Sequence, residues 1–331
     1  MEQEIIEIQY LEGPMKVLLI GNTRIGDFIL SSGLIAHLLD TYPDLRLTIA
    51  CGYLCEPLTR HIPRVERVIS IHKKPLNTHW LDLWHEVRDT HWDMIIDLRN
   101  SFVSRFARKK KVYRLTRPTG KLHKVEEYAR VMGLSPVPNP KIWIDDEHRA
   151  FAREIIPDGM QVIGIGPGAS HLFKRWPAEN FAELCEKLIA PDGPYPDAKI
   201  AIIGSPNELG PAKVIFDRLP VNRVIDLMSG TDLMNAAAAI ERITLYIGND
   251  HGLMHMSAAL GTTTIGLFGP TPPTLYRPWG EKCSFVCSAR PQTELAAIEK
   301  RIGRDKECLM SELSSWAILA VARKTTSGMP P

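Results

Sequence analysis

The sequence predicts an α/β fold of two Rossmann-like domains in tandem, each a parallel sheet built from βαβ units. Its 331 residues exceed what a single hydrophobic core usually serves. Short, nearly continuous apolar runs alternate with helical segments, as is typical of parallel strands covered on both faces. A turn-rich break at residues 157–160 divides these elements into two series, which indicates two domains.

The first series begins with an apolar run at residues 15–20, followed by a loop and a helix at residues 27–40. Further strands are expected at residues 45–50, 65–71, 94–98 and 112–115, and helices at residues 81–88 and 124–132. Three closely spaced prolines indicate an interdomain linker at about residues 135–146. We therefore expect an N-terminal domain of residues 1–146.

The second series forms the expected C-terminal domain, residues 147–331. Its strands are expected at residues 162–165, 199–203, 223–227, 244–247 and 263–268, and its helices at residues 178–188, 209–219, 232–241 and 252–260. A last apolar helix is expected at residues 309–322, followed by a frayed tail at residues 324–331. In such sheets ligands bind at the carboxyl ends of the strands.

Composition indicates an ordinary globular protein, with 44% hydrophobic and 24% charged residues. The apolar runs are too short to span a bilayer. Residues 1–12 contain four Glu and no Lys or Arg, unlike the start of a signal peptide, so a cytoplasmic location is expected.

The six cysteines are expected to be reduced, buried thiols. Cys51 with Cys55 and Cys283 with Cys287 could in principle form a four-thiolate zinc site, but no zinc-knuckle turn surrounds either pair, and residues 283–287 resemble a strand. Asp145-Asp146 is expected to cap a helix. We therefore expect no metal site.

The first candidate site loop, residues 21–27, follows the first strand and ends at Asp27. An acid in the first turn of a helix is favoured by the helix dipole, which is one explanation for Asp27. The alternative is a carboxylate that points into a cleft and acts as a general base.

The second loop, residues 164–177, opens with the pattern G-x-G-x-x-A of dinucleotide-binding turns. The pattern fits poorly, because the helix begins only after Trp176-Pro177 and no acid closes the next strand at the usual distance. Ser170, Lys174 and Arg175 instead indicate a phosphate site, with a basic surface loop as the alternative.

The third loop, residues 248–261, runs from the end of a strand into a helix of small residues. The helix start would present the N–H groups of His251, Gly252 and Leu253 to an anion. A turn with an Asx cap is the alternative explanation.

Together these loops resemble glycosyltransferase family 9, the ADP-heptose:lipopolysaccharide heptosyltransferases, over about residues 15–310. The resemblance rests on Arg24-x-Gly-Asp27, Lys174-Arg-Trp-Pro177, Asn249-Asp-x-Gly-Leu-Met-His255 and Gly269-Pro-Thr271, in this order. It implies a GT-B fold, in which two Rossmann-like domains face each other across a cleft. It also implies inverting transfer of heptose from ADP-heptose to an anionic lipopolysaccharide inner-core acceptor, with no metal and no cofactor.

At the matching positions the resemblance implies that Asp27 is the catalytic carboxylate and that Lys174 assists departure of the diphosphate. The donor site that it implies is formed by Ser170, Lys174, Asp250, His251, Gly252 and Leu253. Thr231 falls where the family contacts the nucleoside. The family usually has Ser or Thr at the position of His251, so this chain departs from the family's pattern beside the expected donor site.

A basic segment, residues 99–124, contains ten Lys or Arg and no acid, although the whole chain carries only +2. It indicates an anionic acceptor or anionic membrane surface, or else a solvated basic helix face. Arg24, Lys121 and His123 are candidate acceptor contacts, although a surface histidine near a helix start is the favoured explanation of His123. No nucleic-acid-binding fold is recognisable.

The expected partners are therefore a nucleotide sugar and an anionic glycolipid, with peripheral contact to the cytoplasmic face of the inner membrane. The alternatives are a family relative that uses another nucleotide sugar or a protein acceptor, and a non-catalytic nucleotide-sugar-binding module. A nicotinamide-dependent oxidoreductase is disfavoured by the long loop after Gly168.

Overall fold

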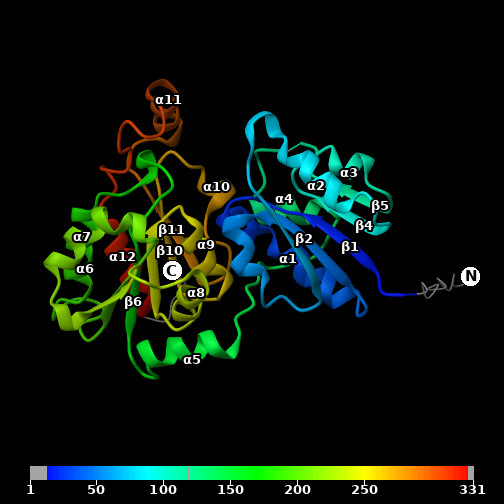
Figure 1. Cartoon of the computed structure of the whole chain (residues 1–331). Coiled ribbons are helices and arrows are strands. Elements are labelled where there is room, and N and C mark those ends of the chain that lie inside the picture. Colours follow the sequence, from blue (N-terminus) through cyan, green and yellow to red (C-terminus); the bar gives the residue numbers. More distant parts are fainter. Residues whose placement is uncertain (1–12, 118, 327–331) are drawn as a thin grey trace, which may run out of the picture.

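Two parallel β-sheets, one from each half of the chain, form the framework of the protein (Figure 1). The computed structural model describes residues 13–117 and 119–326. The first sheet has the strand order β3-β2-β1-β4-β5. Its strands are β1 (Lys16–Ile20), β2 (Arg46–Gly52), β3 (Val65–Ile71), β4 (Trp92–Asp97) and β5 (Lys109–Arg114).

The second sheet has the order β11-β10-β9-β6-β7-β8, and again all neighbouring strands are parallel. Its strands are β6 (Val162–Gly166), β7 (Lys199–Ile203), β8 (Val224–Leu227), β9 (Leu245–Asn249), β10 (Thr264–Phe268) and β11 (Cys283–Cys287). Every residue of β6, β9 and β10 is buried, which explains why these strands are apolar apart from Asn249 and Thr264 at their ends.

Helices connect the strands of both sheets (Figure 1). In the first half they are α1 (Ile25–Thr41), α2 (His79–Val87), α3 (Val103–Phe106) and α4 (Lys124–Val131), with the 3-10 turns η1 (Tyr53–Thr59) and η2 (Pro75–Asn77). In the second half they are α5 (Asp146–Ile155), α6 (Ala178–Leu188), α7 (Leu209–Arg218), α8 (Leu233–Glu241), α9 (Gly252–Ala259), α10 (Pro273–Tyr276), α11 (Gln292–Ile302) and α12 (Ser315–Thr326), with the 3-10 turns η3 (Leu172–Lys174), η4 (Pro206–Glu208) and η5 (Val221–Arg223). No helix within the described residues is both long and apolar enough to cross a bilayer.

The strand order reverses direction beside β1 in the first sheet and beside β6 in the second. In open α/β sheets the crevice at such a reversal is where ligands bind, outside the carboxyl ends of the strands. The loops that follow β1, β6 and β9 leave the sheets at these crevices. They are the three loops that the sequence singled out.

The two halves are packed against each other. A shared cluster of buried apolar side chains includes Phe28 of α1 and Met256 of α9, and these two helices are in contact. The extended segment between α4 and α5 connects the halves, and Nε1 of Trp279 donates to Oδ1 of Asn139 within it at 2.9 Å. The halves therefore meet along the same side as the connecting segment.

The structure corrects the sequence-based prediction of the last helix. The apolar residues Leu309, Met310 and Leu313 are buried, but they lie in an irregular segment, and α12 begins only at Ser315. The helix continues to Thr326, so residues 324–326 are not a frayed tail, and residues 327–331 lie outside the described residues. Helix α11 was not predicted, and β5 begins three residues earlier than expected.

The cysteines follow the prediction only in part. Cys51, Cys55 and Cys185 are buried free thiols, whereas Cys287 is exposed on the edge strand β11. The predicted cap at Asp145 is confirmed, because its carboxylate accepts the N–H of His148 at 3.0 Å at the start of α5. The division of the chain at residue 146 remains a prediction.

Candidate active site

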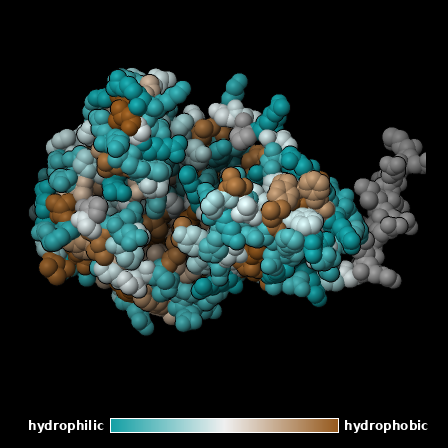
Figure 2. All heavy atoms as spheres, turned by 45° about the horizontal axis from the view of Figure 1, so that its top comes forward, coloured by the Kyte–Doolittle hydropathy of each residue, from teal (hydrophilic) through white to brown (hydrophobic). Residues whose placement is uncertain are grey.

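A cleft of about 540 Å³ lies between the two halves and is lined by residues of both. The space-filling view shows the hollow between them (Figure 2). From the first half it is lined by Arg24, Ile25, Gly26, Asp27 and Leu54. The predicted residues that line it from the second half are Ser170, Lys174, Asp250, His251 and Gly252.

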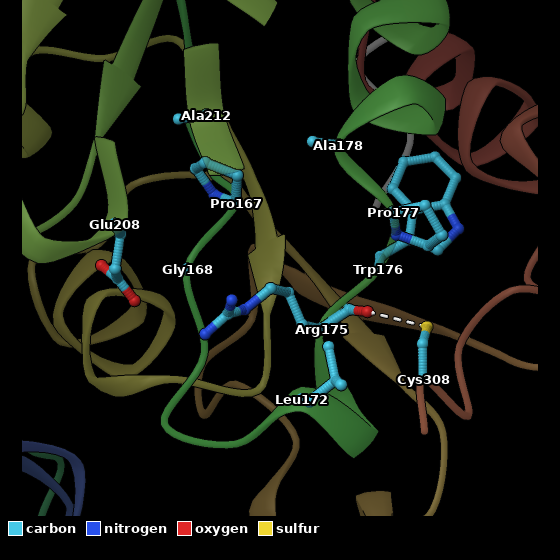
Figure 3. Close-up of a pocket in the computed structure, with 10 residues that line it drawn as sticks. All are labelled: Pro167, Gly168, Leu172, Arg175, Trp176, Pro177, Ala178, Glu208, Ala212 and Cys308. Atoms are coloured by element: carbon cyan, nitrogen blue, oxygen red, sulfur yellow. Dashed lines mark hydrogen bonds between the residues drawn. The ribbon is translucent and has the colours of Figure 1, made fainter. Parts of the chain in front are cut away.

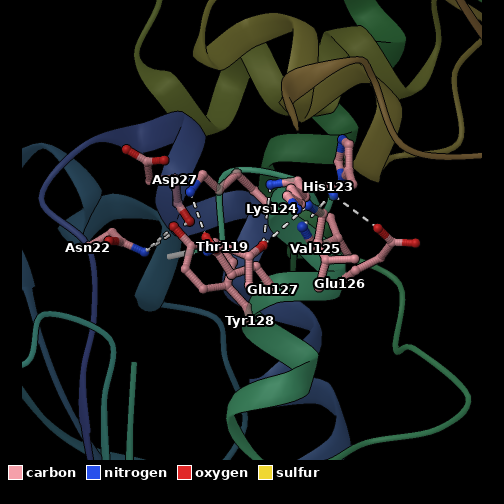
Figure 4. Close-up of polar contacts among 11 residues, drawn as sticks. Asn22, Asp27, Thr119, His123, Lys124, Val125, Glu126, Glu127 and Tyr128 are labelled. Carbon is pink, nitrogen blue, oxygen red and sulfur yellow. Dashed lines mark hydrogen bonds and ion pairs between the residues drawn. The ribbon is translucent and has the colours of Figure 1, made fainter. Parts of the chain in front are cut away.

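Asp27 lies in the first turn of α1, directly beyond the end of β1. Nδ2 of Asn22 donates to the main-chain oxygen of Asp27 at 3.3 Å and to the hydroxyl of Tyr128 at 3.1 Å. In Figure 4 the carboxylate of Asp27 points away from this contact. Burial, and then the charge of Asp27, raise the pKa of Tyr128, so its hydroxyl stays neutral while it accepts the bond from Asn22. Asp27 is thus both a first-turn acid and part of the cleft lining.

The two halves come closest where the first and third loops meet. A Cβ atom on Gly26 would lie 2.9 Å from Cδ2 of His255, and one on Gly252 would lie 3.0 Å from Cγ2 of Ile25. Only glycine at these two positions lets the starts of α1 and α9 come this close without displacing the side chains of His255 and Ile25. The glycine of the Arg24-x-Gly-Asp27 motif therefore brings the start of α1 against the start of α9.

Lys174, at the end of η3, contributes the ammonium group of the second loop. Its Nζ lies 3.1 Å from Oδ2 of Asp250, while Nε2 of His255 lies 3.7 Å from the other carboxylate oxygen. Burial alone would raise the pKa of Asp250, but His255 and Lys174 hold it well below its usual range. Asp250 is consequently a buried carboxylate that remains ionised.

Asn249 ties the second loop to the third. Its Oδ1 accepts the N–H of Trp176 at 3.1 Å, and its Nδ2 donates to the carbonyl of Pro167 at 2.8 Å. These buried bonds satisfy backbone groups that the long loop would otherwise leave unpaired. The motif asparagine therefore fixes the position of the loop that carries Ser170 and Lys174.

Arg175 does not join the predicted phosphate site. Its guanidinium donates to the carbonyl of Ala169 at 3.1 Å and lines a separate pocket of about 160 Å³, near Glu208 and Trp176 (Figure 3). Its own carbonyl accepts from Sγ of Cys308 at 3.1 Å. The prediction for Arg175 was wrong, because successive residues of an irregular loop point in different directions.

His251 occupies the N-cap position of α9, but its side chain accepts no capping bond. The first N–H groups of a helix have no partner within it, so those of Gly252 and Leu253 can receive an anion. The side chain of Leu253 is buried and does not line the cleft. Burial, together with Lys174 and His255, lowers the pKa of His251 against the opposing charges of Glu208 and Asp250, so its imidazole is neutral at pH 7.

Three predicted contacts do not line the cleft: Thr231, Lys121 and His123. Thr231 precedes the N-cap of α8, and Lys121 is exposed. His123 is 2% exposed, so it is not a surface histidine. It caps α4 by accepting the N–H of Val125 at 3.2 Å (Figure 4). Its Nε2 donates to the carbonyl of Arg277 at 2.9 Å. Because both ring nitrogens have protein partners, an acceptor contact through them is not supported.

Several lining residues escaped the sequence analysis: His255, Thr271, Tyr276, Glu299 and Arg304. His255 and Thr271 stood within recognised motifs, whereas Tyr276, Glu299 and Arg304 had no local signal. His255 is 5% exposed, and its Nδ1 has no hydrogen-bond partner within the described residues.

The basic segment is not a helix face. Much of it forms β5, the edge strand of the first sheet, and several of its charges have local partners. Nζ of Lys109 donates to the carbonyls of Arg105 and Ala107, and Nζ of Lys110 lies 2.8 Å from Asp93. Lysines on an edge strand also oppose pairing with other strands.

Solved structures share this architecture. A glycosyltransferase family 9 protein from Veillonella parvula superposes with a TM-score of 0.76 at 20% identity, covering 96% of this chain and 98% of that one. The Escherichia coli ADP-heptose lps heptosyltransferase II gives 0.74 at 21% identity, covering 95% and 99%. These likenesses establish the fold.

Two parallel sheets, with a cleft between the halves at their switch points, define the architecture as a GT-B fold. The sequence model of Glycosyltransferase family 9 (heptosyltransferase) matches residues 109–304. That match covers more than half of the chain, and the protein belongs to this family. The predicted family and fold are therefore confirmed.

Among similar curated proteins is lipooligosaccharide heptosyltransferase 2 of Haemophilus influenzae, 26% identical over 313 residues, covering 82% of this chain and 88% of the relative. Lipopolysaccharide heptosyltransferase 2 of Escherichia coli K12 matches with the same identity and coverage.

Proposed function

We propose that the protein transfers a heptose from ADP-heptose to an anionic acceptor of the lipopolysaccharide inner core, with inversion and without a metal. The observation that carries the proposal is the placement of Asp27 and Lys174 on opposite sides of one cleft, each from a different half. The names of the similar heptosyltransferases support the donor and acceptor classes.

In the proposed reaction Asp27 takes the proton of the acceptor hydroxyl. The hydroxyl oxygen attacks the anomeric carbon, and the bond from that carbon to the diphosphate oxygen breaks on the opposite side. Negative charge then accumulates on the departing diphosphate. Lys174, Ser170 and the N–H groups at the start of α9 stabilise that charge.

Before donor binds, Asp250 holds Lys174 in the cleft. A diphosphate entering beside α9 would share the ammonium with this carboxylate and thereby fix the donor's position. Thr231 is the proposed nucleoside contact, which requires the adenosine to extend toward the start of α8. Asp27 acts from the other half, so relative movement of the halves would align base and donor and exclude water.

The acceptor is proposed to bind the first half, at Arg24 and the exposed part of the basic segment, including Lys121. Carboxylated sugars and lipid phosphates provide the complementary negative charge. The same charge would favour peripheral contact with the cytoplasmic face of the inner membrane, where we place the reaction. In this proposal residues 1–146 form the acceptor domain and residues 147–331 the donor domain.

The test is activity of the purified protein on truncated lipopolysaccharide with ADP-heptose, in the presence of a chelator. Formation of ADP and a heptose-extended product of inverted anomeric configuration is expected. Calorimetry with ADP, UDP, GDP and NAD identifies the nucleotide. Binding of NAD, or transfer only after a metal is added, would contradict the proposal.

A second candidate is a family member that uses another nucleotide sugar or a protein acceptor. The presence of His251, where the family usually has Ser or Thr, favours this second candidate, because the imidazole ring occupies space beside the proposed diphosphate site. A preference for another nucleoside diphosphate sugar over ADP-heptose in the same assay would select this alternative.

A further inference from the structure

Outside the cleft, two histidines flank one carboxylate where the halves of the chain join. Nδ1 of His61 lies 3.4 Å from Oδ2 of Asp145. Nδ1 of His148 is hydrogen-bonded to the other oxygen, Oδ1. Among the described residues this is the group of His, Cys, Asp or Glu side chains close enough together to hold a metal ion, with its ligand atoms within 4.8 Å of one another.

The chemistry of these three groups suits a divalent transition metal. Imidazole nitrogens bind such ions at about 2.0–2.1 Å and carboxylate oxygens at about 2.0–2.2 Å, which places neighbouring ligand atoms roughly 3–4 Å apart. The His61–Asp145 separation is already within that range. The centroids of the two imidazole rings are 5.3 Å apart, and one ligand atom of each of the three residues lies within 4.8 Å of the others.

Among the described residues, no arginine forms an ion pair with the Asp145 carboxylate. Arg149 of α5 forms its ion pair with Glu241, at 3.0 Å. Asp145 thus remains available to the two imidazoles and to its own helix cap. The side chains of His61, Asp145 and His148 are 27%, 31% and 19% exposed, which is enough for an ion to enter and for water to complete its coordination.

The three ligands come from both halves of the chain. His61 follows η1 in the first half, whereas Asp145 and His148 lie at the end of the connecting segment and the start of α5. Both η1 and α5 contact α8. In Figure 1, α5 lies beneath the second sheet, where the connecting segment reaches it. An ion here would hold that segment against the first half, at residues that do not line the cleft.

We propose that His61, Asp145 and His148 form a binding site for one divalent transition-metal ion, such as Zn²⁺, that joins the two halves of the protein. Two imidazole nitrogens and one carboxylate oxygen supply the protein ligands, and water fills the remaining positions. This site differs from the proposed catalytic cleft and does not depend on the proposed reaction. The role is structural, so transfer could remain metal-independent.

The test is direct metal binding by the chelator-treated, full-length protein. Calorimetric titration with Zn²⁺ is expected to give one site, and Co²⁺ is expected to give the visible absorption of a nitrogen- and oxygen-ligated ion. Zn²⁺ should also raise the Tm of the wild-type protein, because an ion that binds only the folded state stabilises it.

Single variants assign the ligands. His61→Ala and His148→Ala should each weaken Zn²⁺ binding by at least about tenfold and remove the rise in Tm, since even groups that merely orient metal ligands cost that much. Asp145→Asn should do the same while preserving the helix cap, because asparagine is an equally good N-cap. His85→Ala, at an exposed histidine of α2, should leave binding unchanged.

Circular dichroism of each metal-free variant establishes that it is folded before it is titrated with Zn²⁺. If an alanine variant is not folded, Asp145→Asn takes its place in the binding test. Wild-type Zn²⁺ binding with a Kd above about 1 mM would overturn the proposal. So would unchanged binding in His61→Ala and Asp145→Asn, because the ion would then occupy the cleft histidines or Cys287. The cluster would in either case be a histidine–carboxylate contact only.

Discussion

Lys174 and Asp250 form an ion pair of 3.1 Å that joins the second and third loops within the cleft. Both side chains are largely buried, so the interaction is screened less than a surface pair. The ammonium is therefore held beside the start of α9, where the leaving diphosphate is proposed to bind. Removing it should affect donor binding and turnover together.

Lys174→Ala is expected to weaken ADP binding by at least about tenfold and to slow turnover, because a charge-assisted contact to phosphate is lost. Lys174→Arg should retain part of both. Calorimetry with ADP and steady-state assays measure the effects. Lys213→Ala, at an exposed lysine of α7 that pairs with Asp217, is the matched control. A change confined to acceptor KM would place the lysine in a different role.

Asp27→Asn separates the two explanations of Asp27. As a general base its loss should lower kcat by about 100-fold or more while ADP binding survives. As a first-turn acid only, its loss should cost about 0.3–1 kcal/mol of stability and leave kcat unchanged. Stopped assays and urea unfolding distinguish these outcomes. Asp40→Asn, near the other end of α1, is the control.

Much of the fold was predictable because each buried parallel strand produces a short apolar run in the local sequence. The buried strands β6, β9 and β10 are mostly apolar, and each predicted site loop follows a strand end. Parallel strands present their carboxyl ends at one sheet edge, so the convergence of Ser170 and Lys174 with Asp250 followed from that geometry. The start of α12 was mispredicted because residues 309–313 are buried without being helical.

The remaining features depend on contacts between distant segments. Nothing in the local sequence indicates that Arg175 turns into a separate pocket while Lys174 enters the cleft. The burial of His123 follows from its contact with Arg277, which lies 154 positions later. Tyr276 and Arg304 reach the cleft from connections whose paths are set by packing. Such residues carry no periodic or motif signal.

His251→Ser tests whether the His251 imidazole becomes protonated when the donor binds. The pKa of His251 is lowered in the ligand-free protein, and an adjacent diphosphate should raise it by favouring the charged form. Donor binding should then take up protons, and affinity should rise as pH falls toward 6. Calorimetry in buffers of different ionisation enthalpy measures this uptake. The serine variant should lose it, and equal uptake in both proteins would assign the proton to another group.

The proposed membrane contact requires exposed charges rather than the whole basic segment. Lys111 and Arg117 are exposed, although the ammonium of Lys111 lies 4.9 Å from the ring centroid of Tyr113. Lys109 and Lys110 are bound to carbonyl or carboxylate oxygens of the first half. Lys111→Glu with Arg117→Glu should weaken binding to anionic vesicles, measured by co-sedimentation, by about 30-fold or more, since each of the two lost positive charges contributes about 1 kcal/mol, and should leave ADP binding intact. Lys213→Glu with Lys199→Glu, in the second half, is the control. Equal losses in both double variants would indicate a nonspecific charge effect.

His123 should make the stability of the protein depend on pH. Burial lowers its pKa from 6.5 to about 4, with the charge of Arg277 acting in the same direction. The unfolded chain therefore binds more protons between these values, so stability is fully present above about pH 6.5 and declines as pH falls toward 4. The shifted pKa of His123 should lower the free energy of unfolding by about 2 kcal/mol between pH 7 and pH 5.

Urea unfolding of wild type and His123→Asn at both pH values isolates this contribution. Asparagine can still cap α4 but does not titrate and cannot reproduce the bond to the carbonyl of Arg277. The variant should accordingly be less stable than wild type at pH 7. Its free energy of unfolding should also fall less than that of wild type between pH 7 and pH 5. His91→Asn, at an exposed histidine, should keep the wild-type decline. Identical pH dependence in wild type and His123→Asn would mean that His123 is protonated normally in the folded protein, and that its contact with Arg277 does not require the neutral imidazole.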